Sequence, residues 1–410
     1  MTPLLDNSHL QRFARIRDRF PGAKTGPYLD VSARGLLYDG AREALDAYLD
    51  RNAAGTLDKG AMFAGVEKTR ALFASLVRAE PDEIAFTRNV TDGIATFGAS
   101  LPWQSGDNVV VCESLEHPAN IFPWYGLSRR LGITVKTVGH RNGHIPLDGI
   151  LAQIDDATRV VAVSAVSFAP GFRFPVAELG AECRRRGVLL IVDGAQSIGV
   201  LDTDVKALNV DALAASTQKS LMGLYGMGFL YVRKEVAEAL APVFLSRFGV
   251  DLEGQHEASA GDAAASYKLA QGARRFDVGN YNYPAILAVG ASLELLLELG
   301  SKEVEAFVCG LARDFANGMV DAGLSVFGGR PGPLGTHIVT VGKSLGFDHD
   351  SAADKDMSDL YAFLTANGVR LGIRRDLLRF SFHIYNNQAD ILRVLDLVRQ
   401  WTAARSRSVA

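Results

Sequence analysis

The sequence predicts an α/β protein with a large domain built on a mostly parallel, seven-stranded sheet and a smaller C-terminal α+β domain. Between about residues 60 and 235, short apolar runs alternate with amphipathic helical segments, which is typical of strands joined by crossover helices. Several of the runs are apolar without alternation, as expected for strands that helices cover on both faces. After about residue 290 helical and strand-like segments follow in a different order, which indicates a second domain.

The elements can be taken in chain order. The strands expected in the large domain are Ile84–Thr87, Asn108–Cys112, Thr134–Val138, Arg159–Val166, Val188–Val192, Ala212–Ala215 and Gly228–Val232. Among the intervening helices, Val176–Arg186 should stop at Gly187, because glycine readily adopts the left-handed conformation that closes a helix. The later elements are helical Ser301–Ala322, strand-like Leu324–Phe327 and His337–Val341, helical Met357–Asn367, strand-like Leu378–Phe382 and the closing helix Asp390–Ala404. We therefore expect a large domain over 40–290, a small domain over 291–410 and an N-terminal arm over 1–39.

Composition excludes several classes of protein. The chain has 410 residues, of which 48% are hydrophobic and 22% charged, and its net charge of −3 offers no basic field for nucleic acid or an anionic membrane. Cys112, Cys183 and Cys309 lie far apart and have neither a disulfide nor a metal-ligand spacing, so we expect no metal. The first residues lack the basic and apolar regions of a secretion signal, and the leucine-rich segment Ile286–Leu299 carries two glutamates. We expect a soluble, cytoplasmic protein.

Two polar residues at strand ends point to the chemistry. The apolar run Val188–Val192 ends in Asp193, and Lys219 follows the next apolar strand in Ser-Thr-Gln-Lys. Ligand sites in parallel sheets lie at the carboxyl ends of the strands. A lysine in such an interior-facing segment is unusual, because burying a free ammonium group is costly. A Schiff base between Lys219 and an aldehyde cofactor explains such a lysine. Pyridoxal 5'-phosphate (PLP) is such a cofactor, and Asp193 would keep its pyridine nitrogen protonated while Gln196 hydrogen-bonds the ring hydroxyl.

The phosphate of this cofactor also needs a binding site. Ile84–Asp92 has the pattern of a strand, a turn and a helix start, where free N–H groups and the helix dipole attract anions. The candidates are Asn89, Val90 and Thr91, joined by Ser216 and Gln218 from the second strand end.

His117 follows a further strand and could stack on the pyridine ring. Taken alone, His117 also fits a packed or capping histidine, Asp193 a helix cap, and Lys219 a solvated loop lysine. Their order and spacing together favour the cofactor site. No glycine-rich motif for a dinucleotide or a nucleoside triphosphate occurs.

The segments VDGAQSIG, STQKSLMGLYGMGFLYVR, LEHPANIFPW and RFSFHIYNN occur in the order found in a known superfamily. They resemble fold-type I PLP enzymes of the class V aminotransferase and cysteine desulfurase superfamily, which includes isopenicillin N epimerase-like and C–S lyase branches. The resemblance implies that Lys219 carries PLP and moves the proton at the substrate Cα, while Asp193 pairs with the pyridine nitrogen and His117 stacks on the ring. It also implies that Arg379 grips the substrate α-carboxylate as a bidentate fork.

The segment Arg275–Tyr283 is similar to a loop that reaches the phosphate of the neighbouring subunit in that superfamily. The resemblance thus implies a homodimer with shared active sites, in which Gly279 and Asn280 approach the partner's cofactor. Tyr281 and Tyr283 would line the substrate entrance or pack in the dimer interface.

The chain also departs from the desulfurases. These enzymes carry a nucleophilic cysteine shortly before the carboxylate-binding arginine, where this chain has Val369–Asp376 without cysteine. That segment holds Arg374 and Arg375, which fit either a site for a distal anionic group of the substrate or two solvated arginines. Phe168 stands where desulfurases have asparagine, Gln218 where histidine is common, and Asn280 where threonine is usual.

Our leading hypothesis is therefore a β-eliminating C–S lyase that acts on a cysteine S-conjugate, because the framework is desulfurase-like but lacks the sulfur-accepting cysteine. A class V aminotransferase is the first alternative, motivated by Ser-Thr-Gln-Lys. An amino-acid epimerase, decarboxylase or decarboxylative deaminase is the second. A binding protein without turnover remains a further alternative. The joint presence of Asp193, His117, Lys219 and Arg379 argues against it. Further candidates for the side-chain pocket are Arg173, Tyr225 and His383.

Overall fold

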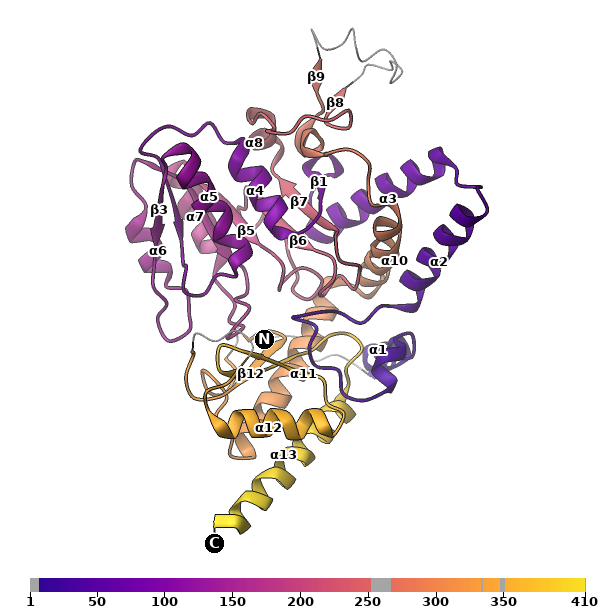
Figure 1. The fold of residues 1–410 in the computed structure, drawn as a ribbon, viewed down its shortest axis with the longest axis vertical. Coiled ribbons are helices and arrows are strands. Elements are labelled where there is room, and N and C mark those ends of the chain that lie inside the picture. The colour runs from indigo at the N-terminus through magenta and orange to yellow at the C-terminus, as the bar shows by residue number, and fades with distance from the viewer. Residues whose placement is uncertain (1–6, 252–266, 333–334, 347–350, 410) are drawn as a thin grey trace.

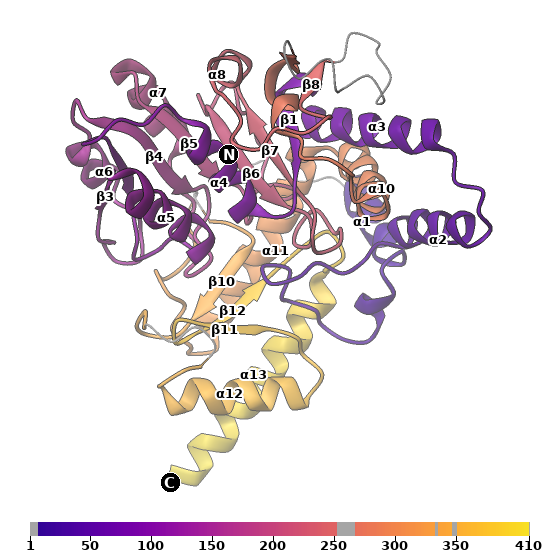
Figure 2. The same ribbon diagram turned by 45° about the horizontal axis from the view of Figure 1, so that its top comes forward.

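The computed structural model describes residues 7–251, 267–332, 335–346 and 351–409. A large α/β domain lies above a smaller domain built from the C-terminal third of the chain, and the last helix extends away from both (Figure 1). Turning the molecule shows the small three-stranded sheet lying below the carboxyl ends of the large one (Figure 2). The predicted α/β class is confirmed.

The large domain is organised around seven strands in the order β1-β7-β6-β5-β4-β2-β3. The neighbours β6, β5, β4, β2 and β3 are parallel, whereas β7 is antiparallel to both β6 and β1. The strands are β1 Ile84–Thr87, β2 Asn108–Val111, β3 Thr134–Thr137, β4 Thr158–Ser164, β5 Leu189–Asp193, β6 Ala212–Ser216 and β7 Gly228–Val232. All strands except β7 thus point the same way, so their carboxyl ends share one edge.

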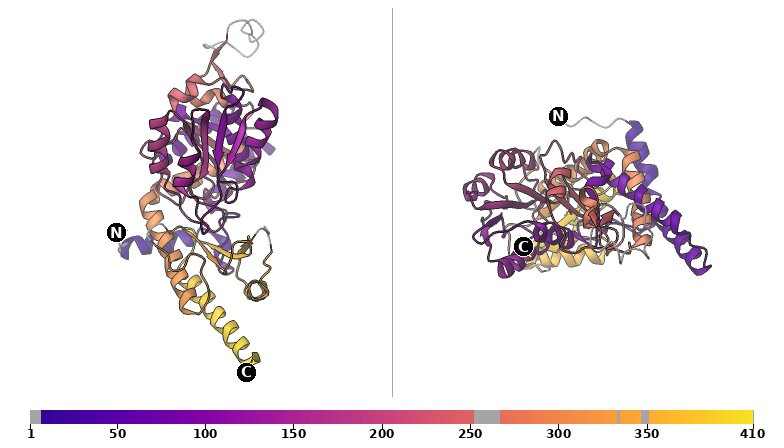
Figure 3. Two further views of the ribbon diagram at one scale, coloured as in Figure 1. Left: turned by 90° about the vertical axis from the view of Figure 1, so that its left-hand side faces the viewer. Right: turned by 90° about the horizontal axis from the view of Figure 1, so that it is seen from above.

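Helices cover both faces of this sheet, which explains the unbroken apolar runs (Figure 3). Val109 and Val111 belong to the apolar core on one face, together with α4, α5 and α8, whereas Val110 belongs to the core on the opposite face with α3, α6, α7 and α10. The helices of this domain are α2 Asp39–Ala53, α3 Lys59–Val77, α4 Val90–Ser100, α5 Phe122–Leu131, α6 Leu147–Gln153, α7 Val176–Arg186, α8 Lys234–Ala239 and α10 Tyr283–Leu299, with short 3-10 helices η2 Pro81–Glu83, η3 Pro118–Asn120 and η5 Gly272–Phe276 and the hairpin β8 Val250–Asp251 and β9 Lys268–Leu269. As expected, α7 ends at Gly187, whose φ is 68°.

The small domain begins at a sharp break in the chain. Helix α10 packs on α2 and α3 and continues through the predicted boundary at 290 to Leu299, and α11 then starts after Gly300 at an angle of 87°. The remaining elements are α11 Ser301–Asp321, β10 Ile338–Val341, α12 Lys355–Ala366, β11 Gly372–Arg374, β12 Leu377–Ser381 and α13 Gln388–Val409. No single described helix is long and apolar enough to cross a membrane; only the bent pair of α10 and α11 reaches that length and composition together.

The N-terminal arm joins the two domains. It contains α1 Asn7–Arg17 and η1 Pro21–Lys24, and its extended part pairs with the small domain at Tyr28–Arg370 and Asp30–Ser381. Its next residues reach the large domain, where the Gly35 N–H donates to the Gln218 carbonyl at 2.8 Å. The arm therefore runs along the edge where the strand ends meet the small domain.

Two predicted details differ from the structure. Leu324–Phe327 is not a strand, because Val326 makes only an isolated bridge with Val341. Strand β11 was not expected, since its three residues Gly-Ile-Arg carry no alternation long enough to detect. It forms because β12 supplies its hydrogen-bonding partner.

Candidate active site

A pocket of about 160 Å³ opens at the carboxyl ends of β1, β4, β5 and β6. Its position follows from the parallel sheet, which brings residues from distant parts of the chain to one edge. The lining residues are Asn89, Val90, Thr91, His117, Ala119, Ser164, Val166, Phe168, Asp193, Ala195, Gln196, Ser216, Gln218 and Lys219. Every cofactor-binding residue that the sequence suggested within a single subunit lies here.

Asp193 ends strand β5 and is buried, with 4% of its surface exposed. Its Oδ1 accepts a hydrogen bond from the Ala195 N–H at 2.8 Å, which fixes the carboxylate at the pocket wall. Burial raises the pKa of the Asp193 carboxyl, while the nearby Lys219 ammonium and the Ala195 N–H oppose that shift. The two charged groups thus stabilise each other across the pocket.

Lys219 follows β6, is half-buried and lines the same pocket. Burial lowers the pKa of Lys219 to about 8, although the Asp193 carboxylate acts in the opposite direction. The positive charges of Arg379 and Arg374 lower this pKa further. Near physiological pH, just below this pKa, most of the amine is still protonated, but the neutral form that acts as a nucleophile or a base is far more abundant than in an ordinary lysine.

Two buried polar atoms at this pocket have no hydrogen-bond partner among the residues that the structure describes. They are Gln196 Oε1 and Ser216 Oγ. The Gln196 side chain is oriented by its Nε2, which donates to the Ser32 carbonyl at 3.0 Å. Since buried polar groups are almost always satisfied, these atoms indicate a polar ligand in the pocket.

The start of helix α4 forms one wall. Asn89 caps this helix by accepting a hydrogen bond from the Asp92 N–H at 2.9 Å. Val90 and Thr91 occupy the first turn, where backbone N–H groups have no partner inside the helix, and both line the pocket. An anionic group fits here, so the pocket combines an anion site, a carboxylate and a lysine, the set that PLP requires.

His117 and Phe168 also line the pocket. Their ring centroids are 5.5 Å apart and the rings are perpendicular. His117 Nδ1 accepts a hydrogen bond from the Ala119 N–H at 3.1 Å, which assigns the ring proton of a neutral imidazole to Nε2. Phe168 lines the pocket with an apolar ring, and Gln196 is a polar residue of the same lining.

A second carboxyl group, that of Glu116, is buried next to the pocket. It accepts hydrogen bonds from the Ser164 N–H at 2.7 Å, the Ser164 hydroxyl at 2.5 Å and the Asn120 amide at 2.8 Å. Burial raises the pKa of Glu116 to about 7, with the negative charge of Asp193 adding to the shift and the hydrogen bonds opposing it. The sequence motif around His117 contains this residue, but nothing in the motif shows its burial.

Arg379 lies on β12 and is almost completely buried. Its Nη1 donates to the Phe168 carbonyl at 3.1 Å and its Nη2 donates to Asp30 Oδ1 at 3.3 Å. Burial raises the pKa of the Asp30 carboxyl, whereas the guanidinium charges oppose this. Sequence reasoning missed Asp30 and the other arm residues here; the polar residues of the Tyr28–Gly35 segment were the available signal.

The neighbouring arginines have different surroundings. Arg374 is half-buried and influences both Asp30 and Lys219 electrostatically. Arg375 is buried, and it donates to the carbonyls of Gly346, at 2.9 Å, and Ser114. It therefore fixes the loop before β12 to the large domain, and the interpretation of Arg375 as a solvated arginine is wrong.

The other candidates for the side-chain pocket are placed as follows. Arg173 pairs with Glu305 of α11 at 2.6 Å, and Tyr225 is 62% exposed. His383 is buried next to Tyr385, and burial lowers its pKa to about 4. None of the three lines the pocket.

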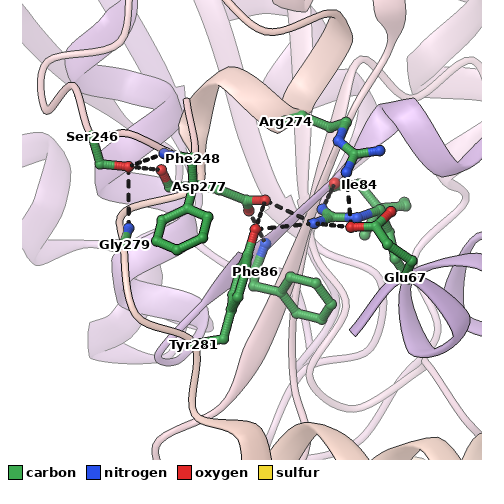
Figure 4. Close-up of polar contacts among 10 residues, drawn as sticks. Glu67, Ile84, Phe86, Ser246, Phe248, Arg274, Asp277, Gly279 and Tyr281 are labelled. Atoms are coloured by element: carbon green, nitrogen blue, oxygen red, sulfur yellow. Dashed lines mark hydrogen bonds and ion pairs between the residues drawn. The ribbon is translucent and has the colours of Figure 1, made fainter. Parts of the chain in front are cut away.

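The segment predicted to reach a neighbouring subunit is anchored away from this pocket. Asp277 Oδ2 accepts hydrogen bonds from Arg70 and from the Tyr281 hydroxyl, both at 2.8 Å, and Oδ1 accepts one from the Phe86 N–H at 2.8 Å (Figure 4). Arg70 and Asp277 are both fully buried. This network fastens the segment to strand β1.

The residues after Asp277 lie at or near the surface. The Gly279 N–H donates to Ser246 Oγ at 3.1 Å, while Asn280 is exposed. Tyr281 and Tyr283 pack against each other and against Phe63. None of Gly279, Asn280, Tyr281 and Tyr283 lines the pocket of its own chain, and their predicted contacts with a partner subunit stay predictions.

None of the three cysteines lines the pocket. Cys112 and Cys183 are buried and Cys309 is half-buried, and all three thiols are free. Burial raises the pKa of Cys112 to about 11 and those of Cys183 and Cys309 to about 12. Thiolate forms are therefore scarce at neutral pH. Within the described residues no cluster of His, Cys, Asp and Glu suits a metal ion.

Comparisons with known proteins agree with this geometry. The family model for aminotransferase class-V matches residues 28–340. The chain is 29% identical to the "Uncharacterized aminotransferase YcbU" of Bacillus subtilis over 93% of this chain and 96% of that protein. It is 27% identical to a "Probable cysteine desulfurase" of Pyrococcus abyssi over 94% of this chain and 96% of the relative.

A solved structure with the same fold is that of C-DES, a cystine C–S lyase. Its complex with the reaction product cysteine persulfide superposes with a TM-score of 0.79 at 23% identity, covering 93% of this chain and 99% of that one. A lysine-to-alanine mutant of C-DES, with glycine covalently linked to its PLP cofactor, gives a TM-score of 0.80 at 23% identity, covering 93% and 98% of the chains.

Proposed function

Because this chain belongs to the aminotransferase class-V family and is a PLP-dependent enzyme, we propose that it cleaves the C–S bond of a cysteine S-conjugate by β-elimination. The observation that carries the proposal is the position of the cysteines: none of the three lines the pocket, and all have raised pKa values. A desulfurase-like framework without an accessible thiolate suits release of the sulfur as a thiol better than its transfer to the protein. The fold shared with the C–S lyase C-DES adds support.

The residues of the pocket suit this chemistry. Lys219 would hold PLP, with Asp193 at its pyridine nitrogen, Gln196 near its ring hydroxyl, and Ser216 with the start of α4 at its phosphate. Bound there, PLP withdraws electrons from the substrate Cα and stabilises negative charge on it. Arg379 does not line the pocket but donates to the carbonyl of Phe168, which does, and in the proposal its guanidinium would bind the α-carboxylate.

The amine of Lys219 then has the properties of the general base. With a pKa near 8 it accepts a proton from Cα, and loss of that proton expels the sulfur substituent from Cβ as a thiol. The three-carbon remainder takes up water and leaves as pyruvate and ammonia, so the sum is conjugate plus water giving thiol, pyruvate and ammonia. The edge of His117 and the Phe168 ring would exclude water from this side of the pocket.

The test is to incubate the holoenzyme with cysteine S-conjugates and to measure thiol and pyruvate. Elimination releases the two in equal amounts without a keto-acid acceptor. A variant with all three cysteines changed to alanine should keep this activity, because no cysteine reaches the pocket. Loss of sulfur release in a folded triple variant would contradict the proposal.

Transamination is the second candidate, favoured by the similarity to YcbU over 93% of the chain. It would convert the cofactor to its amine form and would need a keto acid for a second half-reaction. Accumulation of that form, with no pyruvate from the conjugates, would replace elimination by transamination. The proposed homodimer is tested separately by sedimentation of the holoenzyme.

A further inference from the structure

Glu116 brings a second buried carboxyl group to the strand end that neighbours Asp193. Its Oε1 accepts a hydrogen bond from the Ser164 N–H, and its Oε2 accepts one from the Ser164 hydroxyl. Ser164 ends β4 and is paired with Asp193, which ends β5, in the parallel register of these strands. Since neighbouring strands lie about 4.8 Å apart, the residue that anchors Glu116 is the immediate neighbour of Asp193.

A chain of hydrogen bonds from the next helix fixes the Glu116 carboxyl group in this place. The Trp124 indole N–H donates to Asn120 Oδ1 at 3.3 Å, which orients the amide so that Asn120 Nδ2 donates to Glu116 Oε2 at 2.8 Å. Trp124, Asn120 and Glu116 are all buried. A carboxyl group that is held by three donors and shielded from water is a built part of the fold.

The hydrogen-bond donors of Glu116 are neutral, whereas Asp193 has a cation beside it. The titratable groups whose charges interact with Glu116 are the Asp193 carboxyl and the Cys112 thiol, which burial keeps neutral near pH 7. Lys219 favours the charged form of Asp193. Neighbouring buried carboxyl groups ionise one after the other. Asp193 therefore ionises first, and Glu116 follows near its raised pKa of about 7.

Two further side chains that carry or accept protons adjoin this turn. His117 follows Glu116 in the chain, and its Nδ1 accepts a hydrogen bond from a backbone N–H. Arg375 donates to a backbone carbonyl of the segment before Glu116, and its charge acts on Cys112. Asp193 is the charged group to which Glu116 itself responds.

We propose that Glu116 is a positioning residue that acts through Asp193: when Glu116 ionises, it places a second negative charge beside Asp193 and strengthens the hold of this strand end on the protonated pyridine nitrogen of PLP. The inference rests on the proposed position of Asp193 at that nitrogen. It concerns the pH range over which the cofactor is held, whichever reaction follows.

The sign of the effect follows from electrostatics. A proton on the pyridine nitrogen becomes harder to keep as the pH rises, and Glu116 gains its charge over the same range. Glu116 is 5% and Asp193 4% exposed, so water screens their charges only weakly. A negative charge on Glu116 raises the proton affinity of Asp193 and of a nitrogen bound to it. PLP should therefore leave more slowly when Glu116 is charged than when an uncharged residue stands in its place.

The experiment follows the release of PLP from the holoenzyme by its visible absorption while the released PLP is trapped. The unaltered enzyme and Glu116→Gln are compared at about pH 5.5 and at about pH 8.5, on either side of the pKa of Glu116. The ratio of the two release rates, variant over enzyme, should rise about tenfold between the lower and the higher pH. Damage to the pocket alone would raise the ratio equally at both.

Glu113→Gln is the matched control, since Glu113 belongs to the same segment but is exposed, with its Oε1 accepting a hydrogen bond from the Tyr125 hydroxyl at 2.9 Å. Its ratio should be the same at both pH values. The inference is overturned if the ratio for Glu116→Gln stays constant or falls as the pH rises, or if the control shows an equal rise.

If Glu116→Gln does not fold, Ser164→Ala decides. This variant keeps the Glu116 carboxyl group but removes a hydrogen bond that favours its charged form, so Glu116 should ionise at a higher pH. The release rate of the variant, relative to that of the enzyme, should rise between about pH 5.5 and about pH 7.5. A constant ratio overturns the inference.

Failure of the proposed cofactor site would look different. Asp193→Asn should release PLP faster at both pH values, because the pyridine nitrogen loses its anionic partner. If that variant holds PLP as firmly as the enzyme, the position of Asp193 is wrong whatever Glu116 does. If Asp193→Asn loses PLP while the ratio for Glu116→Gln is independent of pH, only the inference about Glu116 fails. Thiol and pyruvate release tests the reaction separately.

Discussion

The backbone of Gly35 lies against the backbone of Lys219, so closely that a side chain on Gly35 would clash with the Lys219 carbonyl oxygen. The same contact includes the hydrogen bond from the Gly35 N–H to the Gln218 carbonyl. The N-terminal arm is thereby part of the wall that positions Lys219, although most of the large domain lies between Gly35 and Lys219 in the sequence.

Gly35→Ala should therefore push the arm away from the lysine. We expect a loss of about 1–3 kcal/mol in the free energy of unfolding, typical of overpacking, together with faster loss of PLP. Thermal unfolding and cofactor retention on dialysis measure the two effects. Gly126→Ala is the control, because a methyl group there meets no atom within 4 Å; equal behaviour of the two variants would show that the arm contact is unimportant.

The amine of Lys219 should titrate well below an ordinary lysine. In the protein stripped of cofactor, acetylation of Lys219 should reach half its maximal rate near pH 8, since burial lowers its pKa to about 8. Mass spectrometry of the modified peptides gives the rate at each pH, and exposed Lys302 reports the reaction of a solvated amine. A Lys219 profile that coincides with that of Lys302 would contradict the electrostatic description of the pocket.

The buried pair of Arg70 and Asp277 should matter greatly for stability. Asp277→Asn removes the buried charge partner of the Arg70 guanidinium and leaves it only the half-exposed Glu67, 3.3 Å away, so the loss should approach the cost of about 3–5 kcal/mol for breaking a buried ion pair. Denaturant unfolding measures the loss. Glu67→Gln is the control from the same network, where Glu67 is 42% exposed and pairs with Arg274 at 2.7 Å; removing its charge should cost at most about 1 kcal/mol. Similar losses in the free energy of unfolding of Asp277→Asn and Glu67→Gln would show that the buried ion pair stabilises the protein no more than the half-exposed one.

Glu116 should make stability depend on pH. Its pKa in the folded protein is about 7, against 4.5 for the ordinary group, so between these values the folded state binds more protons than the unfolded state. The free energy of unfolding should consequently fall as pH rises from about 4.5 to about 7, by about 3 kcal/mol from this residue. Below and above this window both states are equally protonated.

Glu116→Gln tests this directly, because it removes the titrating group while keeping an oxygen that accepts hydrogen bonds. The difference in free energy of unfolding between the enzyme and the variant should change across pH 4.5 to 7 and stay constant elsewhere. A difference that is independent of pH across that window would show that Glu116 is ionised throughout.

Local pattern alone determined much of this protein. The seven strands of the large sheet match the predicted ranges within two residues, and in all of them except the exposed edge strand β3 burial imposes an apolar signal on consecutive positions. Asp193 and Lys219 were found for a related reason: each directly follows such a run, and parallel strands bring their carboxyl ends together.

Only the tertiary structure decided which distant groups meet. Asp30 pairs with Arg379 across 349 positions of the chain, and Arg70 with Asp277 across 207. No periodicity or spacing connects such residues, since their contact depends on how the arm, the β1 strand and the two domains pack. Short motifs thus predicted the residues that line the pocket, whereas the pairing of Asp30 with Arg379 arises from long-range packing that no local pattern encodes.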